Sequence, residues 1–267
     1  MKVPYSKQYV CPQDLVCLLK NRGLSIDDDK EAVDCLTSAG YYRLSAYCYP
    51  LLKYPKSDHL YKTNASFDYV MKMYIFDREL RMLLFNEIEK IEVAIRSSMS
   101  NIVTEGLNDI FWMTDAANFY SPAIYSKTIS LIQGEIEKTK EEFIAHFLSK
   151  YDSPFPPAWM IVEVISSWMI TLVNLRNLCC HHSRTWNREI PVVPAAPRST
   201  VFPWINSVTT DMKRIYYRIC IIKYLLFTVF PKNTLTEKLK SLLLEFPNID
   251  IRAMGFPSNW RSEPLWN

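Results

Sequence analysis

Residues 172–188, LVNLRNLCCHHSRTWNR, contain the densest group of side chains able to do chemistry. Two adjacent cysteines, two adjacent histidines and three arginines lie in this short segment, which holds half of the chain's four histidines. Four interpretations compete for it: a zinc site, a cysteine nucleophile, a capped helix end and a site that cleaves RNA.

A metal site is the first alternative. Structural zinc needs four ligands that converge on a tetrahedron. Consecutive residues on a helix point about 100° apart, so the four residues 179–182 cannot converge by themselves. The sequence has no CxxC or HxxxH pattern that would supply further ligands. We therefore expect no metal and no other cofactor.

The cysteines and the cations have two further explanations. A cysteine nucleophile needs a base that faces it, and sequence neighbours on a helix do not face each other. Cations are favoured near the C-terminal end of a helix, so the histidines and arginines of this segment are also explained as a helix end.

RNA cleavage is the fourth interpretation. RNA carries its own nucleophile, the 2′-hydroxyl, so Arg176 would need only to hold the charged phosphate and His181 to exchange a proton. Five helical steps separate the two by about 140°, so they flank one face of a helix. Asn177 stacks on His181 at a spacing of four and could orient the imidazole. We take Arg176, Asn177 and His181 as the candidate catalytic set, with the other interpretations left open.

The hydrophobic pattern predicts an all-α fold, an antiparallel helical bundle that would position this segment. The longest predicted helix covers residues 67–104, where apolar residues recur every three or four positions without proline or glycine. Ser25 is the predicted N-cap of the helix expected over 27–38. After the last predicted helix we expect a loose tail to end the chain. The other predicted helices are 12–23, 27–38, 122–150, 158–180, 204–229 and 234–245, while 41–52 is ambiguous between helix and strand.

Composition limits the class of protein. Charged residues are 22% of the chain and hydrophobic residues 49%, which excludes a disordered chain, and the five glycines favour helices over tight hairpins. The net charge of +3 neither requires nor forbids a nucleic-acid partner. We divide the chain into an N-terminal helical and aromatic segment (1–66), a core (67–190) and a C-terminal helical extension (191–267).

The cysteines and the apolar runs bear on localisation. The seven cysteines show no disulfide framework, the first residues have no apolar signal core, and Lys223 interrupts the longest apolar stretch. We predict a cytoplasmic protein with reduced thiols and no membrane contact.

Four blocks in order resemble the Abi-like abortive-infection family (AbiD/AbiF type), whose members are similar to HEPN-domain proteins. The blocks are GYYRLSAYCYPL (40–51), YIFDRELRMLLFNEIEKIEVAIRSSMSN (74–101), PPAWMIVEVIS (156–166) and LRNLCCHHSRTWNR (175–188). The last is the most specific. One departure is visible: the family has a stretch of helix and loop between its W-x-x-x-E helix and its S-W-x7-R-N helix, whereas here Ser166 runs directly into Ser167. We expect a segment of a few dozen residues to be missing there, either because this member has lost a hairpin or, as we favour, because a loop has been left out of the sequence.

The resemblance implies a HEPN-like bundle that acts as a metal-independent endoribonuclease, in phage defence or as a toxin. In similar ribonucleases an R-x4–6-H motif is catalytic, and it falls here on Arg176 and His181. Two such sets would meet in a homodimer, and a small structured RNA is a further implied partner that restrains the activity. A non-catalytic RNA-binding or sensor module is the alternative.

Further residues are candidates beside this set. Glu92 and Arg96 form either an intrahelical ion pair or a layer of residues supporting the active site. Arg43 either binds RNA or caps an aromatic cluster. The cations and the aromatic ring near the motif suit phosphate contact and base stacking, although a buried tryptophan is an equal explanation for the ring. The predicted RNA-binding residues are Arg43, His182, Arg184, Trp186 and Arg188.

Overall fold

A computed structural model describes residues 4, 8–164, 170–197, 200–206 and 210–267. Within these ranges the fold is all-α, as predicted, and the only β-type pairings there are two isolated bridges, Ser25 with Ser66 and Leu52 with Tyr61. The α-helices are α1 (Pro12–Asn21), α2 (Asp29–Ala39), α3 (Tyr41–Cys48), α4 (Phe67–Leu107), α5 (Pro122–Lys138), α6 (Glu142–Lys150), α7 (Ala158–Val164), α8 (Ile170–Cys180), α9 (Ile215–Val229) and α10 (Leu235–Glu245).

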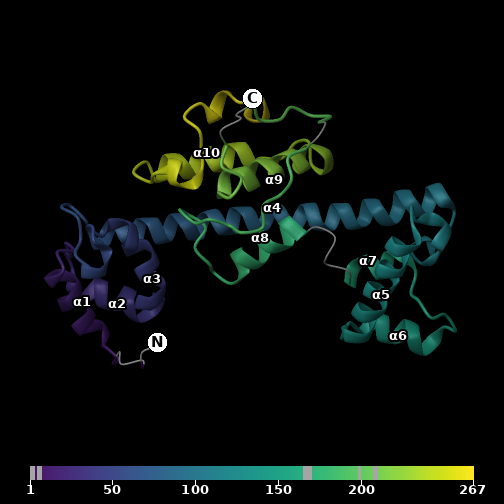
Figure 1. The fold of residues 1–267 in the computed structure, drawn as a ribbon, viewed down its shortest axis with the longest axis horizontal. Helices are drawn as coiled ribbons and strands as arrows, with labels where there is room; N and C mark the ends of the chain where they lie inside the picture. Colours follow the sequence, from purple (N-terminus) through teal and green to yellow (C-terminus); the bar gives the residue numbers. More distant parts are fainter. Residues whose placement is uncertain (1–3, 5–7, 165–169, 198–199, 207–209) are drawn as a thin grey trace.

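Helix α4 is the axis on which the other elements pack (Figure 1). Ser66 caps its start by accepting a hydrogen bond from the backbone N–H of Tyr69, and Asn108 ends it in the left-handed region at φ 49°. Its inward stripe is fully buried, at Val70, Met73, Phe76, Leu80, Leu84, Ile88 and Ile91. The structure thus confirms the long helix that the three-and-four spacing of these residues predicts.

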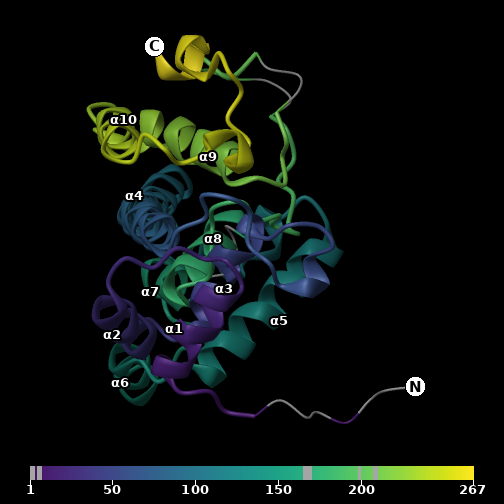
Figure 2. The ribbon, with the colours of Figure 1, turned by 90° about the vertical axis from the view of Figure 1, so that its left-hand side faces the viewer.

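The remaining helices cover α4 on several sides. Helices α1–α3 lie at one end and α5–α7 at the other, while α9 and α10 pack on the side opposite α8 (Figure 1). Figure 2 looks nearly along α4 and shows it between the C-terminal helices and α7 and α8. No helix in the described part combines the length and apolar character that crossing a bilayer requires.

Two hydrophobic cores lie along this axis. The larger joins residues of α1–α4 and α8–α10 with the C-terminal tail, and the smaller joins Trp112, Met113, Ile132, Ala158, Ile161 and Val162 at the far end of α4. The tail was expected to be loose, but Trp260, Leu265 and Trp266 are buried. The indole N–H of Trp266 donates to the Tyr216 hydroxyl at 3.1 Å, which ties the tail to α9.

Several predicted boundaries differ from the structure. The helix expected over 122–150 breaks at Thr139, whose hydroxyl accepts the backbone N–H of Glu141 and so competes with the helical hydrogen bond. The cap of α2 is Asp28 rather than Ser25. Helix α9 begins only at Ile215, after a turn held by Asp211. The ambiguous segment 41–52 is helical through Cys48.

The helix expected over 158–180 is observed as α7 and α8, and the junction of Ser166 with Ser167 lies between them, outside the described residues. The division of the chain into 1–66, 67–190 and 191–267 stays a prediction.

The carboxylate of Asp77 on α4 is fully buried and joins three separate segments. It accepts hydrogen bonds from the Tyr47 hydroxyl of α3 at 2.7 Å and from Nη1 of Arg81 at 2.7 Å. It also accepts the backbone N–H groups of Thr185 at 3.0 Å and Trp186 at 2.8 Å, together with the Thr185 hydroxyl. Burial and the Asp77 charge raise the pKa of the Tyr47 phenol, which keeps it a neutral donor.

We expect Asp77→Ala to lower the free energy of unfolding by about 3–5 kcal/mol, because it leaves the buried Arg81 guanidinium without its counter-charge. Equilibrium urea denaturation measures the change. The matched control is Asp68→Ala on the same helix, which removes an exposed pair with Lys72 and should cost less than about 0.5 kcal/mol. Equal urea midpoints of unfolding for the two variants would show that Asp77 does not stabilise the fold in this way.

Candidate functional site

Helix α8 presents the candidate residues from a fixed platform. Leu172, Leu175 and Cys179 are buried on its inner side, where α8 packs against α4. The helix ends in a Schellman motif, in which the N–H of His182 bonds to the Cys179 carbonyl and that of Ser183 to the Leu178 carbonyl. His182 holds the left-handed position of this motif at φ 52°, a conformation that non-glycine residues adopt at a cost.

Arg176 is held by a buried carboxylate of the long helix. Its Nη1 donates to Oε2 of Glu92 at 2.8 Å, and the Glu92 side chain is only 7% exposed. The other oxygen, Oε1, is buried and has no hydrogen-bond partner among the described residues. Arg176 therefore keeps one defined orientation, with its remaining N–H groups available to a ligand.

Arg96 pairs with Glu163 of α7 at 3.4 Å instead of with Glu92. The intrahelical pair between Glu92 and Arg96 is thus the wrong alternative. Glu92 faces inward against α8 while Arg96 reaches the next helix, so the two residues cross-link α4 to different neighbours.

Asn177 and His181 are exposed, one turn apart, and the backbone N–H of His181 bonds to the Asn177 carbonyl at 2.9 Å. Within the described part of the chain, no side-chain hydrogen bond joins them, so the orienting role of Asn177 stays a prediction. Arg176 points toward α4 while His181 faces solvent, so the two do not converge within one copy of the chain.

The cations and the aromatic ring after α8 have separate surroundings. Trp186 is 3% exposed and its indole N–H donates to the Asp250 carbonyl at 3.1 Å. A buried ring cannot stack on a nucleobase, so the prediction that Trp186 binds RNA is wrong. The Trp186 side chain instead anchors the loop in the hydrophobic core. Arg184 is half-buried and donates to the Ala46 carbonyl of α3, and burial lowers its pKa. Arg43 is exposed on α3, and Arg188 is partly exposed.

Sequence reasoning missed the roles of Asp77 and Arg81. Asp77 fixes the loop that carries the histidines, and Arg81 also donates to the Ser183 carbonyl at 3.4 Å. Their spacing of four, inside a block of apolar residues, was the available signal, since charges on the buried side of a helix need partners.

The cysteines differ sharply in their surroundings. Cys179 is buried, and burial raises its pKa to about 12, while Cys180 next to it is exposed. A thiol with so high a pKa is not the thiolate that a nucleophile requires. Among the described residues, no three His, Cys, Asp or Glu side chains come together as metal ligands would.

Iodoacetamide at mildly alkaline pH should alkylate the exposed Cys17 and Cys180 and spare Cys48, Cys179 and Cys220, whose burial raises their pKa. Peptide mass spectrometry over a time course gives the rate at each site, and the urea-unfolded chain, in which all seven cysteines react, is the control. Alkylation of Cys179 as fast as that of Cys180 would contradict the described packing of α8.

Comparison with known proteins gives one match. A family model described as "Abi-like protein" matches residues 34–167, about half of the chain. The matched range runs from α2 through α7 and contains Asp77, Arg81 and Glu92, whereas Arg176 and His181 follow it. No match is found among the curated proteins or among the solved structures.

Proposed function

The chain belongs to the Abi-like family, and we propose on this premise that it acts in abortive infection against phage as a metal-independent endoribonuclease of HEPN type. The observation that carries the proposal is the rigid placement of Arg176. The buried carboxylate of Glu92 on α4 holds this guanidinium on α8, five residues before the exposed His181. A fixed cation and an exposed imidazole on the same helix suit the chemistry of RNA cleavage when a second copy of the chain completes the site.

The reaction needs no nucleophile from the protein. The 2′-oxygen attacks the adjacent phosphorus and its proton passes to a base, while the bond from phosphorus to the 5′-oxygen breaks and that oxygen takes up a proton. The products are a 2′,3′-cyclic phosphate and a 5′-hydroxyl. His181 exchanges the proton, Arg176 stabilises the charge on the phosphate, and Asn177 orients the imidazole.

Glu92 is a positioning residue in this scheme. It occupies only Nη1 of Arg176, so the other N–H groups of the guanidinium fork can contact a phosphate. Because Glu92 is buried, the pair is little screened by solvent and fixes the arginine before RNA binds.

A second candidate function is a non-catalytic RNA-binding module. It is favoured by the separation of Arg176 from His181 within one copy, where Arg176 is already neutralised by Glu92. The two functions differ in whether RNA is cut, so a cleavage assay separates them.

In EDTA, the protein should cleave single-stranded RNA and leave 2′,3′-cyclic phosphate ends. Arg176→Ala and His181→Ala should each lower the rate about 10²–10⁴-fold while RNA still binds. Matched controls are Arg252→Ala and His146→Ala, both exposed outside the site, which should keep the wild-type rate. Cleavage that requires a divalent metal, or that survives His181→Ala, refutes the mechanism, and binding without cleavage supports the second candidate.

The scheme includes a homodimer, because two Arg–His sets would meet across an interface and each chain supplies one. Sedimentation velocity should give twice the 31.3 kDa mass of the chain. Adding excess His181→Ala chain should suppress wild-type cleavage through mixed dimers, whereas excess His146→Ala chain should not. A monomer with full activity contradicts this part of the proposal.

A small structured RNA is proposed as a further partner that restrains the activity.

A further inference from the structure

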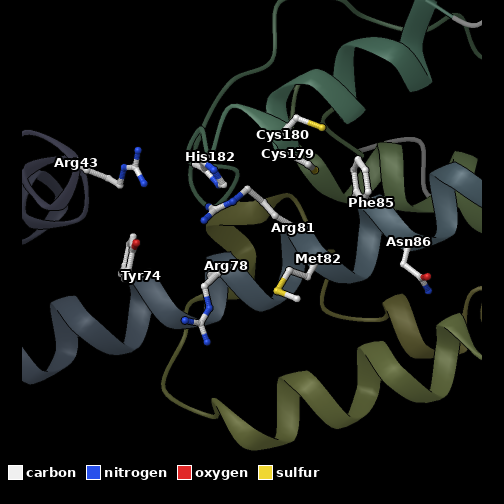
Figure 3. Close-up of a pocket in the computed structure, with 10 residues that line it drawn as sticks. All are labelled: Arg43, Tyr74, Arg78, Arg81, Met82, Phe85, Asn86, Cys179, Cys180 and His182. Atoms are coloured by element: carbon white, nitrogen blue, oxygen red, sulfur yellow. The ribbon is translucent and has the colours of Figure 1, made fainter. Parts of the chain in front are cut away.

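A pocket of about 560 Å³ lies beside α8, between α4, the loop after α8 and the start of α3 (Figure 3). Its volume is in the range of sites that hold small organic molecules. Arg43, Phe85 and Asn86 are exposed at its edge, so it opens to solvent. Arg176 and His181 do not line it, whereas His182, the next residue after His181, does.

One end of the pocket is cationic. Arg43, Arg81 and His182 lie there, from three elements, while the guanidinium of Arg78 points away from them (Figure 3). No carboxylate is among the described residues that line the pocket. Arg78 pairs with Glu79 and Arg81 with Asp77, so both guanidinium groups are oriented from outside the pocket. Arginine forks of this kind match the oxygens of a phosphate.

The side chain of Arg81 forms a fixed part of the pocket wall at this end. This side chain is 5% exposed, and its Nη1 is fixed by Asp77 and the Ser183 carbonyl. Its Nε and Nη2 groups make no hydrogen bond with the described residues. The C-terminal end of α8 disfavours an anion here, but the Schellman motif already satisfies the carbonyls of Leu178 and Cys179. Arg43, which pairs with no carboxylate among the described residues, supplies the net positive charge at this end.

The other end of the pocket is suited to binding a nucleobase. Phe85 is 40% exposed and Met82 61% exposed, and both lie on the pocket side of α4 (Figure 3). Asn86 donates its amide N–H to Glu87, which leaves its amide oxygen free to accept from a base. An exposed aromatic ring beside an amide acceptor is a surface on which a nucleobase stacks and hydrogen-bonds.

We propose that this pocket binds one nucleotide of a single-stranded RNA, with its phosphate at the arginines and its base on Phe85. The inference rests on the proposed function for its choice of RNA: a strand held at His181 passes directly to His182 and into the pocket. The pocket thereby positions the nucleotide next to the scissile phosphate and selects unpaired RNA, because a base within a duplex cannot reach Phe85.

The test is equilibrium binding of a fluorescently labelled single-stranded RNA of about 12 nucleotides, a length within the usual range for such sites. Binding is measured by anisotropy in EDTA, with every protein carrying His181→Ala so that the probe stays intact. Phe85→Ala should weaken binding about 10-fold through lost stacking, with an unchanged salt dependence. Phe143→Ala, a partly exposed phenylalanine on α6, is the matched control and should bind like the parent.

Arg43→Ala should weaken binding and lower the slope of log Kd against log salt by about 0.7, the value for one phosphate contact to a single strand. Arg252→Ala, an exposed arginine of the C-terminal tail, should leave that slope unchanged. Circular dichroism of each variant checks that it remains folded.

Equal RNA affinity of Phe85→Ala and Phe143→Ala overturns the proposal. Competition by free 5′-AMP as strong as that by unlabelled RNA also overturns it, because the pocket would then be a mononucleotide site. The two proposals fail separately. Phe85-dependent binding without any cleavage by the wild-type chain refutes the ribonuclease alone, and cleavage with Phe85-independent binding refutes the pocket alone.

Discussion

The buried carboxylate of Asp77 fixes the loop after α8, and the positions of both histidines depend on that loop. A carboxylate out of water is very costly unless its oxygens are fully hydrogen-bonded. Here Tyr47, Arg81, Thr185 and Trp186 supply the donors from α3, α4 and the loop. A shift of the loop would remove the Thr185 and Trp186 donors from this buried carboxylate and leave it with Tyr47 and Arg81 alone, so the same carboxylate that holds α3 to α4 also sets the position of the loop after α8.

Helix α4 carries the rest of the site on one stripe. Asp77, Arg81, Phe85 and Glu92 project within about 80° of each other around the helix axis. This stripe therefore serves the loop, the pocket and the arginine of α8 in turn. Because the adjoining stripe of apolar residues on α4 is packed into the larger core, α4 cannot rotate to change one of these contacts without changing the others.

Residues that are neighbours in the sequence after α8 differ in how far they are buried. Arg184 and Trp186 anchor the loop to α3 and to the C-terminal tail, whereas the histidines before them stay exposed. The left-handed turn at His182 sends His182 toward the pocket, while His181 stays on the outer side of α8. The proposed proton transfer and the proposed nucleotide binding are thus assigned to adjacent residues with different surroundings.

The residue pattern alone was enough to predict the helices with strong periodicity, above all 67–104, and to select the segment around Arg176 and His181 as the candidate for chemistry. These follow from local hydrogen bonding and side-chain spacing, which a short stretch of sequence contains. The packing of the helices was needed to show that Glu92 pairs with Arg176 rather than Arg96, that Trp186 is buried, and that Arg78 and Arg81 line a pocket with His182. A charged residue has several possible partners nearby, and which one it meets depends on the helix packed against it, which spacing along the chain does not specify.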